Sequence, residues 1–365
     1  MNQSNLKKLQ NLLKEKDIDI FVINRSDEYL NEYISPNAER LNFITNFSGS
    51  AGRAIITPTD AFLYVDGRYT FQANTQINAK EIQAKHLNSF WTDLEKILLE
   101  EEYKIALDPT LHSIIEIEKV EKMLENSTSQ LQLIDKNFVD LIWENQPKTQ
   151  YTDIFDHPTS FAGQSRSEKL DILKKFLDQN EIDHYFVSGL DNIAWLLNLR
   201  ADDIKYTPLL YSYLLISKNN KHSLYIKQSS MPEILKKEIQ TLININNIEN
   251  IGSIFNNINS SESIGLDFNS TTFYFLDLLR KQKINTKNLA NPCILLKAIK
   301  NETELDGAKK AHIRDGVSIT KYIYWLKNIM DPKSNDEISV AHHLENLRRK
   351  NELFHSLSFD TISAI

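Results

Sequence analysis

The strongest constraint on the fold of this chain is an internal repeat of about 160 residues, far longer than the ~20–50 residue period of a solenoid. An amphipathic helix leads into IDIFVIN at residues 18–24, and a second one leads into IDHYFVS at residues 182–188. Further along, KIALDPT at 104–110 is echoed by SIGLDFN at 263–269, each a short strand, an Asp and a polar turn before a helix. Repetition over several successive elements predicts two copies of one α/β domain.

The composition narrows the class of protein. The chain has 365 residues, of which 41% are apolar and 25% charged, which suits two or three globular domains. Its net charge of −7 comes from interspersed acids and bases, so no surface for nucleic acid is expected. Cys293 is the only cysteine, which excludes an intramolecular disulfide and favours a reducing compartment.

Neither a secretory signal nor a membrane span is indicated. Residues 1–16 place leucines at helical spacing between lysines, where a signal would have an unbroken apolar run. No later stretch approaches the ~18–20 continuous apolar residues of a transmembrane helix. We therefore expect a cytoplasmic protein that does not bind a membrane.

The repeat divides the chain into four regions. We expect a first domain at 1–150, a linker at 151–165, a second domain at 166–300 and a third region at 301–365. Pro147 and Pro158 mark a stretch without an apolar period, which is typical of a linker.

The third region contains two predicted helices. Asn301 and Glu304 have the spacing of a capping box at the start of the first, and Ser334 and Glu337 have the same spacing before the second. The final stretch, FHSLSFDTISAI at 354–365, looks like a helix tail followed by the beginning of a strand. Two helices and one strand are too little for a domain with its own core.

Two motifs in the first copy invite a functional interpretation. SGSAG at 48–52 matches no phosphate-binding loop and is followed by a strand, so a tight turn or a close backbone approach is favoured over nucleotide binding. VDGRY at 65–69 places Arg68 and Tyr69 at the end of a strand. A guanidinium there could clamp a carboxylate or a peptide carbonyl, but a surface ion pair fits the spacing equally well.

The histidines of the third region are weak evidence for a metal site. His342 and Glu345 would share a helix face, and His355 follows nearby, but adjacent His343 cannot face the same site as His342. Solvated or partly packed helix residues are the favoured interpretation. His312 is likewise expected to be a hydrogen-bonded residue at the edge of a core rather than a catalyst.

Four stretches together resemble the aminopeptidase P family of Xaa-Pro aminopeptidases, part of the creatinase/prolidase-type metallopeptidases. The resemblance runs in the family's order through nearly the whole chain, at 27–73 with SGSAG and DGRY, 190–216, 297–326 and 357–365. It implies two creatinase-like N-terminal domains, each a mixed sheet flanked by helices. A pita-bread catalytic domain follows them in that family, and it removes the first residue from peptides with proline in second position.

The resemblance also implies a metal-dependent hydrolase. In that family two divalent ions, commonly manganese, are held by two Asp, one His and two Glu, and a bridging water attacks the scissile carbonyl. All five ligands fall beyond the stretch that SFDTISAI matches, so we expect this chain to be an N-terminal part that is truncated before the site, binds no metal and is inactive alone. Five aspartates of the third region lie outside the ligand motifs and receive no metal role: Asp306, Asp315, Asp331, Asp336 and Asp360.

One site residue is carried over from the family. Arg68 in VDGRY matches its peptide-binding arginine, which implies a substrate contact. Proline-containing peptides and a homodimer are the partners implied for intact relatives. The alternative is a non-catalytic peptide-binding, protein-binding or dimerisation module built from tandem creatinase-like domains.

Overall fold

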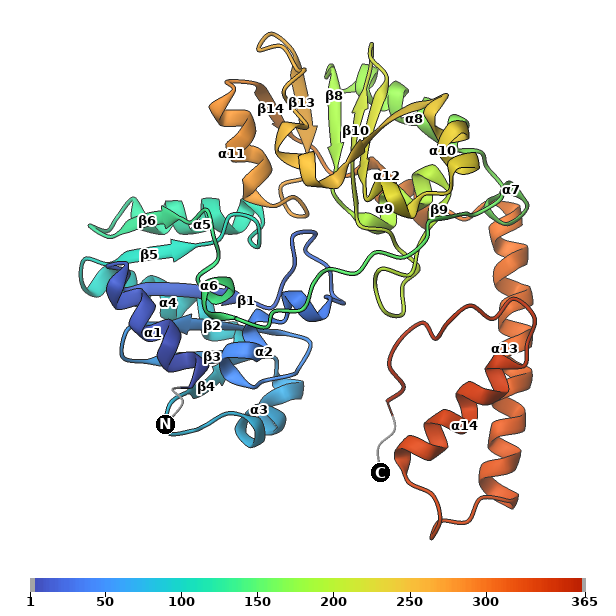
Figure 1. Cartoon of the computed structure of the whole chain (residues 1–365), viewed down its shortest axis with the longest axis horizontal. Coiled ribbons are helices and arrows are strands. Elements are labelled where there is room, and N and C mark those ends of the chain that lie inside the picture. Colours follow the sequence, from blue (N-terminus) through green and yellow to red (C-terminus); the bar gives the residue numbers. More distant parts are fainter. Residues whose placement is uncertain (1–3, 363–365) are drawn as a thin grey trace.

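The computed structural model describes residues 4–362 and contains two α/β domains followed by a helical arm (Figure 1). In the first domain, short strands with apolar residues on both faces are separated by amphipathic helices. Its elements are α1 (Asn5–Glu15), β1 (Ile20–Asn24), η1 (Pro36–Ala38), α2 (Arg40–Thr45), β2 (Gly52–Ile56), β3 (Ala61–Val65), η2 (Gly67–Tyr69), α3 (Thr70–Gln76), β4 (Gln83–His86), η3 (Leu87–Ser89), α4 (Phe90–Glu100), β5 (Lys104–Leu107), α5 (Ile114–Leu124), β6 (Gln130–Leu133) and α6 (Phe138–Ile142).

The second domain repeats this order after a short connection. The connection holds β7 (Phe155–Asp156) and α7 (Thr159–Ala162). The domain itself comprises α8 (Arg166–Gln179), β8 (His184–Val187), α9 (Leu190–Leu197), β9 (Leu199–Arg200), β10 (Ser212–Ser217), β11 (His222–Ile226), η4 (Gln228–Ser230), α10 (Glu233–Gln240), β12 (Ile243–Asn247), η5 (Ile248–Ser253), β13 (Ser263–Leu266), α11 (Phe273–Lys281), β14 (Asn285–Asn288) and α12 (Pro292–Ala298).

The two domains have six-stranded mixed sheets of the same topology. The strand order is β4-β3-β2-β1-β5-β6 in the first and β12-β11-β10-β8-β13-β14 in the second. In each sheet the first strand pairs antiparallel with one neighbour and parallel with the other. This confirms the tandem α/β prediction and the mixed sheets flanked by helices. The predicted linker contains a short strand, because β7 pairs antiparallel with β9.

Three apolar layers hold the domains together. Alternate residues of β1 point to opposite faces, so Phe21 packs in the layer under α1 and α2, while Val22 packs under α4 and α5. The second layer continues across the domain boundary to Phe186 and Tyr213 of the second sheet, and a third layer lies under α8 and α9. The middle layer is therefore a core shared by both domains.

Equivalent turns of the two domains meet at this boundary with local twofold symmetry. Ile114 N donates to Thr271 O at 3.0 Å, and Phe273 N donates to His112 O at 3.0 Å, so shifting 114 to 273 and 112 to 271 interchanges the two bonds. A second symmetric pair joins Ile115 N to Phe268 O and Tyr274 N to Pro109 O. The contact has the self-complementary pattern of an isologous interface, made within one chain.

The helical arm consists of α13 (Glu302–Asn328) and α14 (Glu337–Arg349). The capping box of Asn301 and Glu304 is confirmed. The second predicted box is wrong: Ser334 donates to Asp331 in the preceding turn, and Asp336 caps α14 instead with Ser339 as its partner. The expected strand is also absent from 354–362, while 363–365 lie outside the described residues.

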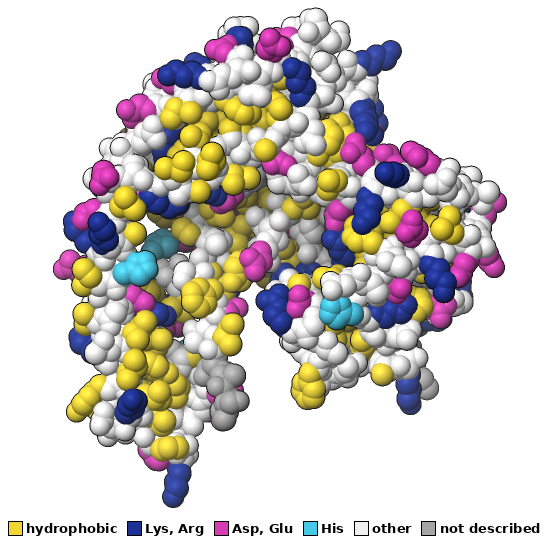
Figure 2. All heavy atoms as spheres, turned by 180° about the vertical axis from the view of Figure 1, so that it is seen from behind, with side chains coloured by type: hydrophobic (Ala, Val, Ile, Leu, Met, Phe, Trp, Pro, Cys, Tyr) yellow, Lys and Arg dark blue, Asp and Glu magenta, His cyan; other side chains and the backbone are white. Residues whose placement is uncertain are grey.

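The arm carries many exposed apolar side chains. Ile313 and Ile338 are more than 60% exposed, and Figure 2 shows apolar side chains along the arm, which forms a lobe separate from the first domain. Exposed apolar faces of this kind mark interaction surfaces or favour self-association. Within residues 4–362, no helix is long and apolar enough to cross a lipid bilayer.

Candidate functional site

Arg68 lies in η2, immediately after β3 at the edge of the first domain. Asp66 caps this short helix: its Oδ1 accepts hydrogen bonds from Arg68 N at 3.0 Å and from Arg68 Nε at 2.8 Å. The hydrogen bond from Arg68 holds the pKa of the Asp66 carboxyl below its usual range. Because the Arg68 side chain is 72% exposed and meets Asp66 through Nε, the fork of its guanidinium faces outward.

The SGSAG segment lies beside Arg68 and supports its neighbours. Ser50 Oγ and Tyr69 OH are 2.5 Å apart, and the ring of Tyr69 packs edge-on against Phe47. A Cβ added at Gly52 would lie 3.2 Å from the carbonyl oxygen of Tyr64. Gly52 therefore marks a close backbone approach, one of the two interpretations that the sequence favoured, and the Ser50–Tyr69 contact joins the two motifs in one surface.

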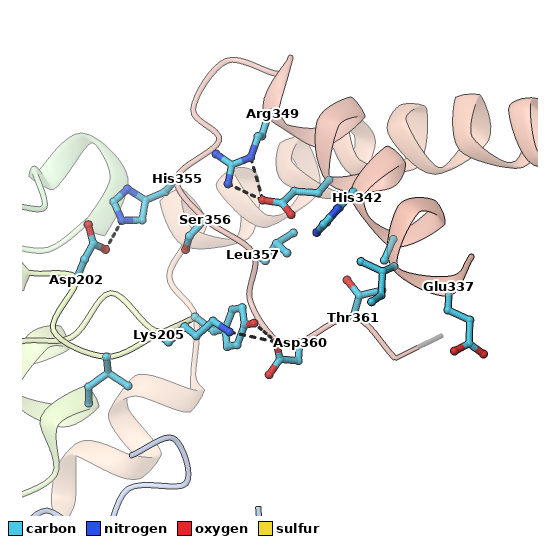
Figure 3. A pocket seen from close by; sticks show the side chains of 15 residues that line it. Asp202, Lys205, Glu337, His342, Arg349, His355, Ser356, Leu357, Asp360 and Thr361 are labelled. Carbon is cyan, nitrogen blue, oxygen red and sulfur yellow. Dashed lines mark hydrogen bonds and ion pairs between the residues drawn. The ribbon is translucent and has the colours of Figure 1, made fainter. Parts of the chain in front are cut away.

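A second candidate lies at the other side of the molecule, in a cavity of about 740 Å³ (Figure 3). Its walls come from three segments: the loop after β9, the exposed face of α14 and the chain from His355 to Thr361. Arg68 is not among the lining residues, so the structure does not bring together the two sets of residues that the sequence singled out.

Ion pairs across the cavity fasten the last segment to the second domain. His355 Nε2 lies 2.6 Å from Asp202 Oδ1. Lys205 Nζ lies 3.4 Å from Asp360 Oδ1, which also accepts a hydrogen bond from Tyr206 OH. Since these groups are about half exposed or more, each pair is a weak tether.

The α14 wall adds His342 and Glu345, as the helical spacing predicted. Glu345 Oε1 accepts a hydrogen bond from Arg349 Nε at 2.9 Å, and the imidazole of His342 is drawn toward the open space (Figure 3). The lining contains four carboxylates, two permanent cations and two imidazoles, so it carries a net negative charge when the histidines are neutral. Its chemistry suits a cationic or hydrogen-bonding group better than an anion.

The lining residues do not fit the two-metal site that the family resemblance implies. His342, Glu345 and His355 reach the same cavity, but Glu345 is bound to Arg349 and His355 to Asp202. Within residues 4–362, no group of three or more His, Cys, Asp or Glu side chains could hold a metal ion. The loop residues Asp202, Lys205 and Tyr206 escaped the sequence analysis, although the charge run ADDIKY at 201–206 was a usable signal.

Comparisons with known proteins show which family shares this fold. Residues 5–136 and 145–304 each match the family described as the creatinase/prolidase N-terminal domain. A probable Xaa-Pro aminopeptidase P of Paracoccidioides brasiliensis is 32% identical over 381 residues, covering 98% of this chain and 61% of the relative. A probable Xaa-Pro aminopeptidase P of Neosartorya fischeri is 34% identical over 376 residues, covering 98% of this chain and 57% of the relative.

This chain belongs to the aminopeptidase P family. It spans about 60% of the length of the relatives it matches. Among solved structures, the X-prolyl aminopeptidase of Caenorhabditis elegans, described as a cytosolic enzyme with a di-nuclear active site, superposes with a TM-score of 0.90 at 24% identity. That match covers 99% of this chain and 62% of the nematode protein, and it extends the shared fold of this aminopeptidase P family member to the helical arm.

Proposed function

We propose that this chain forms the N-terminal domains of a Xaa-Pro aminopeptidase and contributes a substrate contact rather than the hydrolytic centre. The observation that carries the proposal is the end-to-end similarity to Xaa-Pro aminopeptidase P relatives over 98% of the chain. The lack of a suitable metal-ligand group within residues 4–362 supports assigning hydrolysis to other residues. For the complete enzyme we propose two divalent ions, manganese first, a cytoplasmic location and proline-containing peptides as substrates.

The proposed substrate contact is Arg68. Its backbone is fixed by the Asp66 cap, while its exposed guanidinium offers paired N–H groups to a peptide carbonyl or carboxylate. Tyr69 lies beside it, and a hydrogen bond between its hydroxyl and that of Ser50 holds this neighbouring side chain in place.

The first test is hydrolysis of Xaa-Pro peptides by the purified 365-residue chain with added manganese, beside a metal-content assay. We expect no turnover and no bound metal. Turnover abolished by a chelator would refute the assignment of the hydrolytic centre to other residues.

Peptide binding tests Arg68 independently. We expect a tripeptide that begins with Ala-Pro to perturb the NMR signals of η2. Arg68→Ala should abolish the perturbation. Lys96→Ala is a matched control, since Lys96 is an exposed cation of the same domain paired with Glu100. If Arg68→Ala and the control bind alike, Arg68 is not the contact.

A binding or dimerisation module is the second candidate, favoured by the apolar arm. Ile313, Val317 and Tyr324 are exposed on one face of α13. A homodimer that uses this face would give a sedimentation coefficient that rises with concentration, and Ile313→Glu would abolish the rise. Concentration-independent sedimentation of the unaltered chain would exclude dimerisation through this face.

A further inference from the structure

A small crevice at the boundary of the two domains has the features of a ligand site. It has a volume of about 240 Å³ and lies where the carboxyl end of β1 meets the start of β2 and the first turn of α5. Asn24, Arg25 and Arg53 line it from the first domain, and Asn269 closes it from the second. In this sheet β1 has an antiparallel neighbour on one side and a parallel one on the other, which resembles the switch-point position where α/β sheets bind ligands.

Arg25 is held rigidly and still has an unused donor. Its Nη1 donates to Glu32 O at 3.0 Å and to Ser50 O at 3.1 Å, and its Nη2 donates to Glu39 Oε1 at 2.9 Å. The side chain is only 10% exposed, and its Nε is buried without a hydrogen-bond partner. A buried donor without a partner is rare in native proteins and calls for an explanation.

Arg53 presents the same situation on the adjacent strand. Its Nη2 is paired with Glu116 Oε1, and its guanidinium lies over the rings of Phe90 and Trp91, at 5.1 and 5.3 Å from their centroids. Its Nη1 is buried and unpartnered. Two immobilised guanidinium groups therefore line one crevice, each with an N–H group left over.

Asn24 adds a hydrogen-bond acceptor to these two donors. Asn24 is 6% exposed, and its Nδ2 donates to Leu111 O at 3.5 Å, while its Oδ1 has no partner. The charged residues that line the crevice are two arginines and one carboxylate, Glu116, so the lining has a net charge of +1 and suits a single negative charge. Two charged donors and one acceptor match a carboxylate that carries a hydrogen-bond donor on the next carbon.

We propose that this crevice binds a small 2-hydroxy or 2-amino monocarboxylate. After small side-chain rotations bring these buried atoms to the crevice, the carboxylate accepts hydrogen bonds from Arg25 Nε and Arg53 Nη1, and the hydroxyl or amino group donates to Asn24 Oδ1. Since Asn269 belongs to the second domain, a ligand in the crevice also links the two domains. The site is separate from Arg68 and from the cavity beside α14, so it stands whether or not the proposed function holds.

Lactate and propionate form a matched pair of probes, because propionate lacks only the 2-hydroxyl. Binding to the full 365-residue chain is measured by NMR titration, with the amide signals of residues 24–26 as the readout. We expect lactate to bind, and propionate to bind roughly fivefold or more weakly through loss of one hydrogen bond to a buried acceptor. Equal affinity for the two probes would overturn the role of Asn24, and no binding of either at about 50 mM would overturn the site.

Arg53→Lys keeps the positive charge beside Glu116 but removes the free Nη1. We expect roughly tenfold or greater weakening of lactate binding, as for loss of a charge-assisted hydrogen bond. Arg280→Lys is the control, because Arg280 is paired with acids at the same domain boundary but does not line the crevice. Circular dichroism verifies folding, and the lactate-propionate comparison needs no variant. Inorganic phosphate binding more tightly than lactate would contradict the monocarboxylate assignment.

Discussion

Replacing Lys169 by methionine should change how the stability of the second domain depends on pH. Lys169 is 1% exposed at the start of α8, and its Nζ donates to Trp195 O and to Asn198 Oδ1, both at 2.8 Å. These acceptors lie at the carboxyl end of α9, where a cation is favoured. Burial nevertheless dominates, and it lowers the pKa of Lys169 from 10.5 to about 8.

The sign follows from proton linkage. Between about pH 8 and 10.5 the unfolded chain keeps the proton on Lys169 while the folded chain releases it, so stability rises with pH. Below the folded pKa the full penalty for the buried charge is present, about 3 kcal/mol at roughly 1.4 kcal/mol per pH unit. From about pH 7.5 to about pH 10, the stability of the wild-type chain relative to Lys169→Met should rise by about 2 kcal/mol.

Urea unfolding followed by circular dichroism at several pH values measures this difference. Methionine also removes two hydrogen bonds, but that loss does not depend on pH and cancels from the slope. Lys175→Met, an exposed position on the same helix, is the control and should give a parallel profile. If the profile of Lys169→Met is also parallel to that of the wild type, then burial does not lower the pKa of Lys169.

Three further changes test the packing. Gly163 has φ of +68°, and a Cβ there would clash with the side chain of Asn301, so Gly163→Ala should lower the free energy of unfolding by about 1 kcal/mol or more in urea titrations. Cys293 is fully buried with its pKa raised to about 12 by burial, so a thiol reagent should modify it only after denaturant is added. The ring of Tyr213 stacks on that of Tyr29 across the domain boundary, with their centroids 4.7 Å apart. Tyr213→Ala should therefore lower the free energy of unfolding by about 3 kcal/mol or more, while Tyr213→Phe should keep most of the stability.

Much of the fold could be predicted because its signals are local. The strand at 18–24 and its copy at 182–188 are short apolar runs, and Asn301 with Glu304 reports a helix start within four residues. The second capping box failed because Ser334 had a better local partner in Asp331, a competition that spacing alone does not resolve. The expected strand is also absent from residues 354–362, where no neighbouring strand pairs with the chain.

The candidate sites were less accessible to sequence reasoning. Arg68 sits in a motif and could be singled out, and its role as a substrate contact stays a prediction. The partner of His355 is Asp202, 153 residues away, and nothing in the local pattern of either residue indicates the other. Arg25 and Arg53 resemble ordinary surface arginines in the sequence, and only the pairing of β1 with β2 shows that both line one crevice.

The repeat itself separates residues that serve the framework from residues that serve a site. Asp108 and Asp267 occupy equivalent turns, and each accepts hydrogen bonds from the residues that follow it, so both copies keep this function. Arg53 lies opposite Asn24 in the first sheet, and continuing the pairing of Val187 with Leu214 by one residue puts Tyr213 at the equivalent place in the second. One copy fills that position with an aromatic ring that packs into the shared core, and the other fills it with an arginine that leaves a buried N–H unpaired. Since the strand pairing is the same in both copies, the sheet itself does not require an arginine at this position, and we expect the difference to reflect the binding role proposed for Arg53.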